Sequence, residues 1–264
     1  MSSMTQVKET NQRLEQRWFL INLEAAIDAL DVHKLNATKL KELNLNVKLC
    51  RMTLDQNSEF KPHFFAPRPN LPQPSDEILN EACLVGDPEQ CFTDPYSRAY
   101  AIHTDWNSYA FHQVRFDAHG PWCSKEPIDY TPYKDLYQHD DPSFGAFRMM
   151  DSEGSKFPHF KAVIYNDLEA DNETCFRGEL LISLRLMLGQ LRKLRLAHHN
   201  IAPVLLISLM GKRARLLESY FDEKSKSLVV RSSDLYEFSN QTSISKAFKT
   251  LAEYFLGDAV GNTD

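Results

Sequence analysis

The sequence lacks a long hydrophobic run. Its longest strongly apolar stretch covers residues 201–210, which is too short to cross a bilayer as a helix. The first thirty residues mix basic and acidic side chains, and no apolar core follows a basic start, so a secretory leader is not expected. We therefore predict a protein without a membrane-spanning helix, located in the cytoplasm or the nucleus.

Glycine and paired cysteines are also scarce. With nine glycines in 264 residues, a backbone loop that cradles phosphate is not expected, and no Walker loop, G-x-G-x-x-G or G-x-S-x-G motif occurs. The five cysteines are scattered without a C-x-x-C pair, and this odd number indicates reduced thiols rather than a disulfide framework. These absences remove the nucleotide-binding and hydrolase classes that such motifs define.

Apolar and aromatic side chains are present in the proportions of a folded protein. Hydrophobic residues make up 42% of the chain and aromatic residues 11%, which is enough to build a sizeable core. The net charge of −6 argues against a generally basic nucleic-acid binder.

The N-terminal part predicts helices, one strand and a proline-rich connection. Apolar positions at helical spacing predict a helix over residues 12–30. Asn36 is a suitable cap for a short second helix, and residues 47–54 alternate as a strand does. Five prolines between residues 61 and 75 favour a strap, with phenylalanines at its entry. We therefore divide the chain into an N-terminal helical segment at 1–60, a strap at 61–75 and an α+β domain at 76–264, packed together as one unit.

The rest of the chain predicts a mixed sheet flanked by helices. Its middle is rich in aromatic and turn residues, and we expect strands at 100–102 and 109–116 and long surface loops over 123–155. The C-terminal pattern is a strand, a helix, a buried strand, a hairpin and a closing helix; these elements are expected at 160–165, 174–199, 204–210, 215–231 and 244–255. The fold class is therefore α+β, with this C-terminal core beside a loop-rich N-terminal part.

A basic segment at 177–215 contrasts with the acidity of the rest of the chain. It holds eight Lys and Arg residues and a single acid, a local charge of +7, whereas the whole chain carries −6. Helical spacing turns its arginines away from the apolar stripe, so we expect a basic face in solvent. Guanidinium groups suit phosphate or carboxylate ligands because their planar fork donates paired hydrogen bonds. The predicted binding residues are Arg185, Arg192 and Arg195, supported by Lys212, Arg213 and Arg215.

This basic face has three interpretations from the sequence alone. It can pair with acidic residues of the same protein, bind an acidic protein partner, or bind nucleic acid. The first of these is a purely structural role.

The candidate catalytic residues belong to no complete motif. His103, His112 and His119, with Asp105 and Asp117, are donors that suit zinc or iron, but their spacing matches no ligand template, so we expect ordinary polar histidines. The acids Asp151, Asp167 and Glu169 are candidates for holding magnesium or for acid and base roles. Cys175, near a helix start, is the candidate nucleophile.

Two resemblances are carried by residues 157–257. The runs at 177–181, 189–191, 203–211 and 235–238 resemble an uncharacterised protein family of filamentous fungi, which implies no particular activity. A strand, a helix with the pair Gln190-Leu191, and an apolar strand also resemble the PD-(D/E)XK nuclease fold. That fold implies an acid on one strand and Glu-x-Lys or Asp-x-Lys on the next, around magnesium. Residues 161–167 contain no acid-x-Lys pair, so this resemblance implies a non-catalytic descendant.

The sequence leaves the function open between three classes. The first is an intracellular, non-catalytic binding protein that uses the basic helix face and no cofactor. The second is a divergent metal-dependent phosphodiesterase, hydrolase or secondary-metabolism enzyme, which would use magnesium or zinc. The third is a small-molecule pocket in the aromatic region 96–122.

Overall fold

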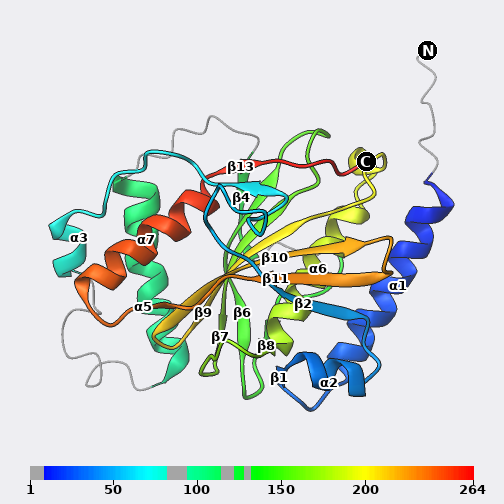
Figure 1. Cartoon of the computed structure of the whole chain (residues 1–264), viewed down its shortest axis with the longest axis horizontal. Coiled ribbons are helices and arrows are strands. Elements are labelled where there is room, and N and C mark those ends of the chain that lie inside the picture. The colour runs from blue at the N-terminus through cyan, green and yellow to red at the C-terminus, as the bar shows by residue number, and fades with distance from the viewer. Residues whose placement is uncertain (1–8, 82–93, 114–121, 128–131) are drawn as a thin grey trace.

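One mixed β-sheet runs through the molecule and carries helices on both faces (Figure 1). The structure is a computed structural model that describes residues 9–81, 94–113, 122–127 and 132–264. In this part of the chain the strand order is β2-β11-β10-β9-β7-β6-β4, with β12 beside β10 and β5 beside β6. These strands are β2 (Val47–Arg51), β4 (Trp122–Lys125), β5 (Tyr137–Gln138), β6 (Phe144–Ser152), β7 (Phe160–Asn166), β9 (Val204–Met210), β10 (Arg213–Asp222), β11 (Ser227–Ser232) and β12 (Tyr236–Glu237). The predicted α+β class is confirmed.

The centre of the sheet is the parallel pair β7 and β9, joined by helix α6 (Arg177–Leu191). Parallel neighbours need a crossover connection, and a helix supplies it here. Every residue of both strands is buried, as expected for apolar strands that are covered on both faces. The structure confirms the predicted strands at 160–165 and 204–210 as β7 and β9. It also confirms the predicted hairpin, which consists of β10 and β11.

Helices α1 (Asn11–Asp28) and α6 lie on one side of the sheet, whereas α5 (Pro95–Ser108) and α7 (Gln241–Phe255) lie on the other (Figure 1). The alternation of side chains along β7 separates two cores: Ile164 packs under α6, whereas its neighbour Val163 packs against α5 and α7. The predicted closing helix is confirmed as α7. Within the described part of the chain, no helix combines the length and the hydropathy needed to cross a membrane.

Helices α1 and α6 run antiparallel, and each supplies an arginine to the carboxyl end of the other. Arg13, near the start of α1, donates to the carbonyl oxygen of Leu191 at 2.8 Å and to that of His199. Arg177, at the start of α6, donates to the carbonyl oxygen of Ile27 at 3.0 Å. The last carbonyl groups of a helix lack partners within the helix, and cations suit this end of the dipole. The two arginines therefore fix the relative position of these helices.

Smaller elements connect the main ones. They are β1 (Lys34–Leu35), α2 (Ala37–Glu42), β3 (Phe65–Ala66), α3 (Asp76–Glu81), a π-helix (Tyr109–Gln113), β8 (Cys175–Phe176), a 3₁₀-helix (Leu194–Leu196) and β13 (Asp258–Ala259). In the proline-rich segment, Phe64 and Phe65 are buried and β3 pairs with β13, whereas Phe60 is 58% exposed.

Three predictions of secondary structure are wrong. The expected strands at 100–102 and 109–116 are helical over all their described residues, because Asp94 caps α5 by accepting from the Ser97 N–H at 2.8 Å and Pro95 begins it. The expected loops over 123–155 contain the nine-residue strand β6. The helix expected over 174–199 is shorter, because α6 ends at Leu191.

His159, next to the first residue of β7, links stability to pH. Its ring is fully buried, packs against Phe64 and Phe65, and hydrogen-bonds the carbonyl oxygen of Val260 at 2.9 Å. Burial lowers the pKa of His159 from 6.5 to about 4, because the imidazolium would lose its hydration there. The unfolded chain therefore binds this proton between pH 6.5 and 4 while the folded chain does not, so stability falls as the pH falls through this window.

We predict that His159→Gln reduces the loss of unfolding free energy between pH 7 and pH 4 by up to about 3 kcal/mol. Urea denaturation at a series of pH values measures this difference. Thr242→Gln supplies the control, since it changes an exposed side chain without an ionisable group and should leave the pH dependence of stability unchanged. An unaltered pH dependence in the His159 variant would contradict the prediction.

Candidate anion-binding site

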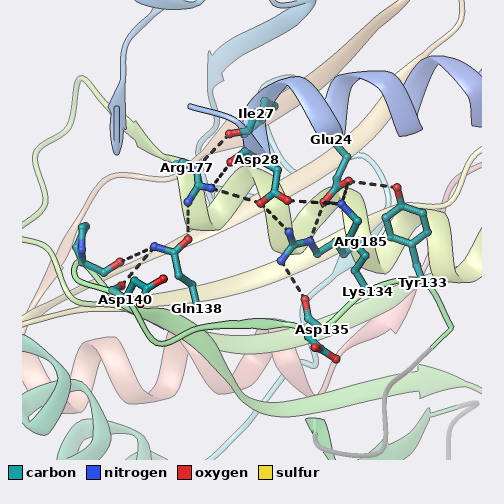
Figure 2. A network of polar contacts seen from close by, with 11 residues as sticks. Glu24, Ile27, Asp28, Tyr133, Lys134, Asp135, Gln138, Asp140, Arg177 and Arg185 are labelled. Carbon is teal, nitrogen blue, oxygen red and sulfur yellow. Dashed lines mark hydrogen bonds and ion pairs between the residues drawn. The ribbon is translucent and has the colours of Figure 1, made fainter. Parts of the chain in front are cut away.

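The prediction that the basic face of α6 lies in solvent is wrong. Arg185 is 6% exposed, and helix α1 covers the face on which it lies. Its Nε donates to Glu24 Oε1 at 2.9 Å and its Nη2 to Asp28 Oδ1 at 2.9 Å (Figure 2). Arg177 on the same helix also contacts Asp28. Glu24, Asp28, Arg177 and Arg185 form what we call the α1–α6 ion-pair network.

Glu24 is the centre of this network. Its side chain is fully buried, and besides Arg185 it accepts from Lys134 Nζ at 2.8 Å and from the Tyr133 hydroxyl at 3.1 Å (Figure 2). Burial and the charge of Glu24 raise the pKa of Tyr133 to about 12, so the phenol remains the donor. A buried carboxylate needs such partners because its desolvation is otherwise uncompensated. Arg185 therefore has a structural partner inside the protein.

Arg215 is held in the same way by Glu179, in the first turn of α6. It is 2% exposed, and its Nε and Nη2 donate to the two carboxylate oxygens of the fully buried Glu179 at 2.9 and 2.5 Å. Glu179 also accepts the N–H of Phe176 at 2.7 Å, which fixes the start of α6. By contrast, Arg213 is partly exposed and pairs with Glu237 at 3.2 Å, and Lys212 lies half-buried in the turn before β10.

The early end of α6 places two other cations beside Asp151. Lys193 and Arg195 follow α6 in the chain instead of lying on it, and their side chains reach the C-terminal end of strand β6. Lys193 Nζ donates to Asp151 Oδ2 at 2.6 Å, and Arg195 Nη2 lies 3.3 Å from the same oxygen. Arg195 also donates to the carbonyl oxygen of Ser152 at 3.0 Å. The structure thus brings together one predicted acid and one predicted binding residue.

Gln190 supports Asp151 from within the protein. Its side chain is fully buried, and its Nε2 donates to Asp151 Oδ1 at 2.9 Å and to the carbonyl oxygen of His159 at 3.1 Å. The sequence-based prediction missed this role. The signal was a glutamine within an otherwise largely apolar helix, because a buried amide needs polar partners.

A cavity of about 590 Å³ opens beside these side chains. We call it the Asp151 pocket and define it by six of its lining residues, Cys123, Lys125, Asp151, Glu153, Lys193 and Arg195. Burial lowers the pKa of Lys193 below its usual 10.5, Asp151 acts in the opposite direction, and the charges of Arg195 and Lys125 lower it further. The three cations Lys125, Lys193 and Arg195 give this pocket the hydrogen-bond donors that an anionic group requires.

The remaining predicted acids lie elsewhere. Asp151 is near the end of β6 and pairs in register with the first residue of β7, whereas Asp167 follows the last residue of β7. Because a β-strand rises about 3.3 Å per residue, the length of β7 places these two acids about 20 Å apart. Glu169 is exposed and lies 3.7 Å from Arg98. In the described residues, no group of three His, Cys, Asp or Glu side chains is arranged to hold a metal. The three acids of the enzyme hypothesis therefore do not form one site.

The predicted histidine and aromatic candidates are also dispersed. His103 is half-buried and stacks on Phe147 at 4.8 Å between ring centroids, whereas His112 is exposed. Trp106 and Tyr109 fill the core beneath α7, so this part of the aromatic region is packing rather than a pocket. His119 and Asp117 lie outside the described residues.

The lysine on strand β7 faces away from Asp151. Lys161 is fully buried, and its Nζ donates to the carbonyl oxygens of Phe255 and Gly257 at 3.1 and 2.6 Å, at the end of α7. Two positions before it stands His159 rather than an acid. Lys161 therefore caps a helix on the other side of the sheet and does not contribute to the Asp151 pocket.

Arg192 is the remaining predicted contact. It is exposed, and its Nη1 donates to the carbonyl oxygen of Pro132 at 3.0 Å, beside the pocket.

Comparison of the chain with protein-family models, with curated proteins and with solved structures finds no match. The interpretation of the site therefore depends on its geometry alone.

We predict that Arg215→Met lowers the free energy of unfolding by about 3 kcal/mol, because it leaves the carboxylate of Glu179 buried without its cation. Arg213→Met, two residues earlier on the same strand, should cost less than about 1 kcal/mol, since its ion pair is exposed. Urea denaturation of both variants measures the difference. Equal losses would show that burial of the Glu179 pair is not what matters.

We also predict that Cys175 is unreactive in the folded protein. It is buried, and burial together with the nearby Glu179 raises the pKa of its thiol well above 9.0. Iodoacetamide should therefore modify the exposed Cys50 and leave Cys175 intact until the protein is unfolded. Mass spectrometry of the digested protein distinguishes the two, and alkylation of Cys175 at the rate of Cys50 would contradict the assignment.

Proposed function

We propose that the protein is a binding protein for a phosphate or carboxylate group, which it takes into the Asp151 pocket. The observation that supports this most is the convergence of Lys193 and Arg195 on one wall of a cavity of about 590 Å³. Arg177 and Arg185, which lie on α6 itself, pair with Asp28 and Glu24 inside the protein, so they do not serve a ligand.

The arrangement of donors supports an anionic rather than a cationic ligand. Asp151 is the only acid in contact with Lys193 and Arg195 among the interactions of the described residues, and this cluster carries a net positive charge. The other acid of the lining, Glu153, is exposed, and Lys125 adds a third cation. An incoming anion therefore gains charge-assisted hydrogen bonds without displacing Asp151 from Gln190.

The anionic group can come from two sources that present the same chemistry to the pocket. One is a free small molecule, and the other is the phosphate of a nucleic-acid strand. The order of β7, α6 and β9, with β7 and β9 parallel, supports the further proposal of a nuclease-like ancestry. In this proposal the protein has lost catalysis and has kept the binding of phosphate. The position of Lys161 on the opposite face of the sheet argues that the binding is non-catalytic.

We predict that inorganic phosphate binds to the protein and that Arg195→Gln weakens this binding about tenfold, because one charge-assisted hydrogen bond is lost. Isothermal titration calorimetry at low ionic strength measures the affinity. Lys224→Gln is the matched control, since Lys224 is exposed in the turn between β10 and β11, away from the pocket.

Fluorescence anisotropy of labelled single- and double-stranded nucleic acid across a salt series separates the two sources. Affinity that falls linearly on a log–log salt plot, and that depends on Arg195, indicates a nucleic-acid phosphate. Phosphate binding without nucleic-acid binding indicates a small molecule. If phosphate does not bind, or binds equally well to the Arg195 variant, the proposed site is wrong.

A further inference from the structure

We propose that Lys193 is the nucleophile of the Asp151 pocket, and that the anionic ligand is an aldehyde or ketone which the pocket holds as a reversible imine. This inference rests on the proposed function, because the anionic group of the ligand positions its carbonyl. It adds a covalent step that anion binding alone does not require.

The geometry gives Lys193 both access and a proton acceptor. Its side chain is 22% exposed and lines the cavity, so a ligand in the pocket can reach it. Its Nζ lies 2.6 Å from Asp151 Oδ2, and at this hydrogen-bond distance a proton can pass directly from the amine to the carboxylate. Lys161 offers a contrast, because it is fully buried and lies on the other face of the sheet.

Asp151 does not hold the ammonium of Lys193 alone. The same carboxylate accepts a hydrogen bond from Gln190 at 2.9 Å and lies 3.3 Å from Arg195 Nη2. Its negative charge is therefore divided among three donors. The second cation competes with the ammonium of Lys193 and weakens the preference of Lys193 for its charged form.

Burial and the neighbouring cations favour the neutral amine of Lys193, whereas Asp151 favours the charged form. Partial burial lowers the pKa of Lys193, and the positive charges of Arg195 and Lys125 lower it further, against the opposing effect of Asp151. Desolvation and neighbouring cations are the two conditions that turn a lysine into a nucleophile for carbonyl compounds.

The step needs no reagent beyond the ligand. Asp151 accepts a proton from the Lys193 ammonium, and the freed nitrogen lone pair attacks the carbonyl carbon while the C=O π electrons move to oxygen. Proton transfer gives a neutral carbinolamine. Its hydroxyl group then leaves as water, with the proton that Asp151 returns, as the C=N bond forms. Arg195 remains bound to the anionic group of the ligand and holds the carbonyl carbon near Lys193.

Pyridoxal 5′-phosphate is a suitable probe because it carries an aldehyde and a phosphate on one small molecule. The protein is incubated with a stoichiometric amount of the probe, the imine is reduced with sodium cyanoborohydride, and the modified lysines are located by peptide mass spectrometry. We expect Lys193 to be modified at least tenfold more than exposed lysines, and excess inorganic phosphate to suppress this modification.

Two variants and one control test the assignment. Lys193→Arg keeps the ion pair with Asp151 but cannot form an imine, so selective modification should disappear. Arg195→Gln keeps the amine but removes a phosphate contact, so modification of Lys193 should fall several-fold. Lys224→Arg, in an exposed turn, should label at Lys193 as the wild type does. Circular dichroism confirms that each variant is folded.

The outcomes separate this inference from the proposed function. If phosphate binds in calorimetry but the probe modifies exposed lysines as readily as Lys193, the covalent step is wrong and the anion site stands. If phosphate neither binds nor suppresses modification, both proposals are wrong. Selective modification of Lys193 that phosphate suppresses and that Arg195→Gln reduces supports both.

Discussion

The packing of α1 against α6 depends on charges that are buried between them. The carboxylate of Glu24 has no exposure to water, so its stability requires the guanidinium of Arg185 and the neighbouring donors Lys134 and Tyr133 (Figure 2). Arg13 and Arg177 add a reciprocal contact, because each binds the carboxyl end of the opposite helix. A helix near the N-terminus is thereby joined to the crossover helix at the centre of the sheet.

This arrangement divides the basic segment of the chain between two roles. The arginines on α6 and Arg215 of β10 compensate acids inside the protein. The cations that follow the end of α6 at Leu191 are placed differently, since the chain turns there and carries Lys193 and Arg195 to the edge of strand β6. The pocket therefore exists because the helix stops, and Gln190 in its last turn fixes the carboxylate around which the pocket is built.

The sequence predicts the elements whose signal is local and misses what depends on distant partners. The strands at 160–165 and 204–210 and the closing helix follow from continuous apolar runs or from helical periodicity. The sequence predicts a strand at 100–102 because aromatic residues favour strands in general, but these residues lie in helix α5, which the cap at Asp94 begins. The burial of Arg185 does not follow from the local sequence, because the helix that covers it lies more than 150 residues earlier in the chain.

A double-mutant cycle on Glu24 and Arg185 tests the central claim most directly, namely that this buried ion pair holds α1 against α6. The unfolding free energies of the wild type, Glu24→Gln, Arg185→Met and the double variant give the coupling energy between the two side chains. The structure predicts a coupling of about 2 kcal/mol or more, because the pair is desolvated and directly hydrogen-bonded. A coupling below about 0.5 kcal/mol, the value of an exposed pair, would contradict this account.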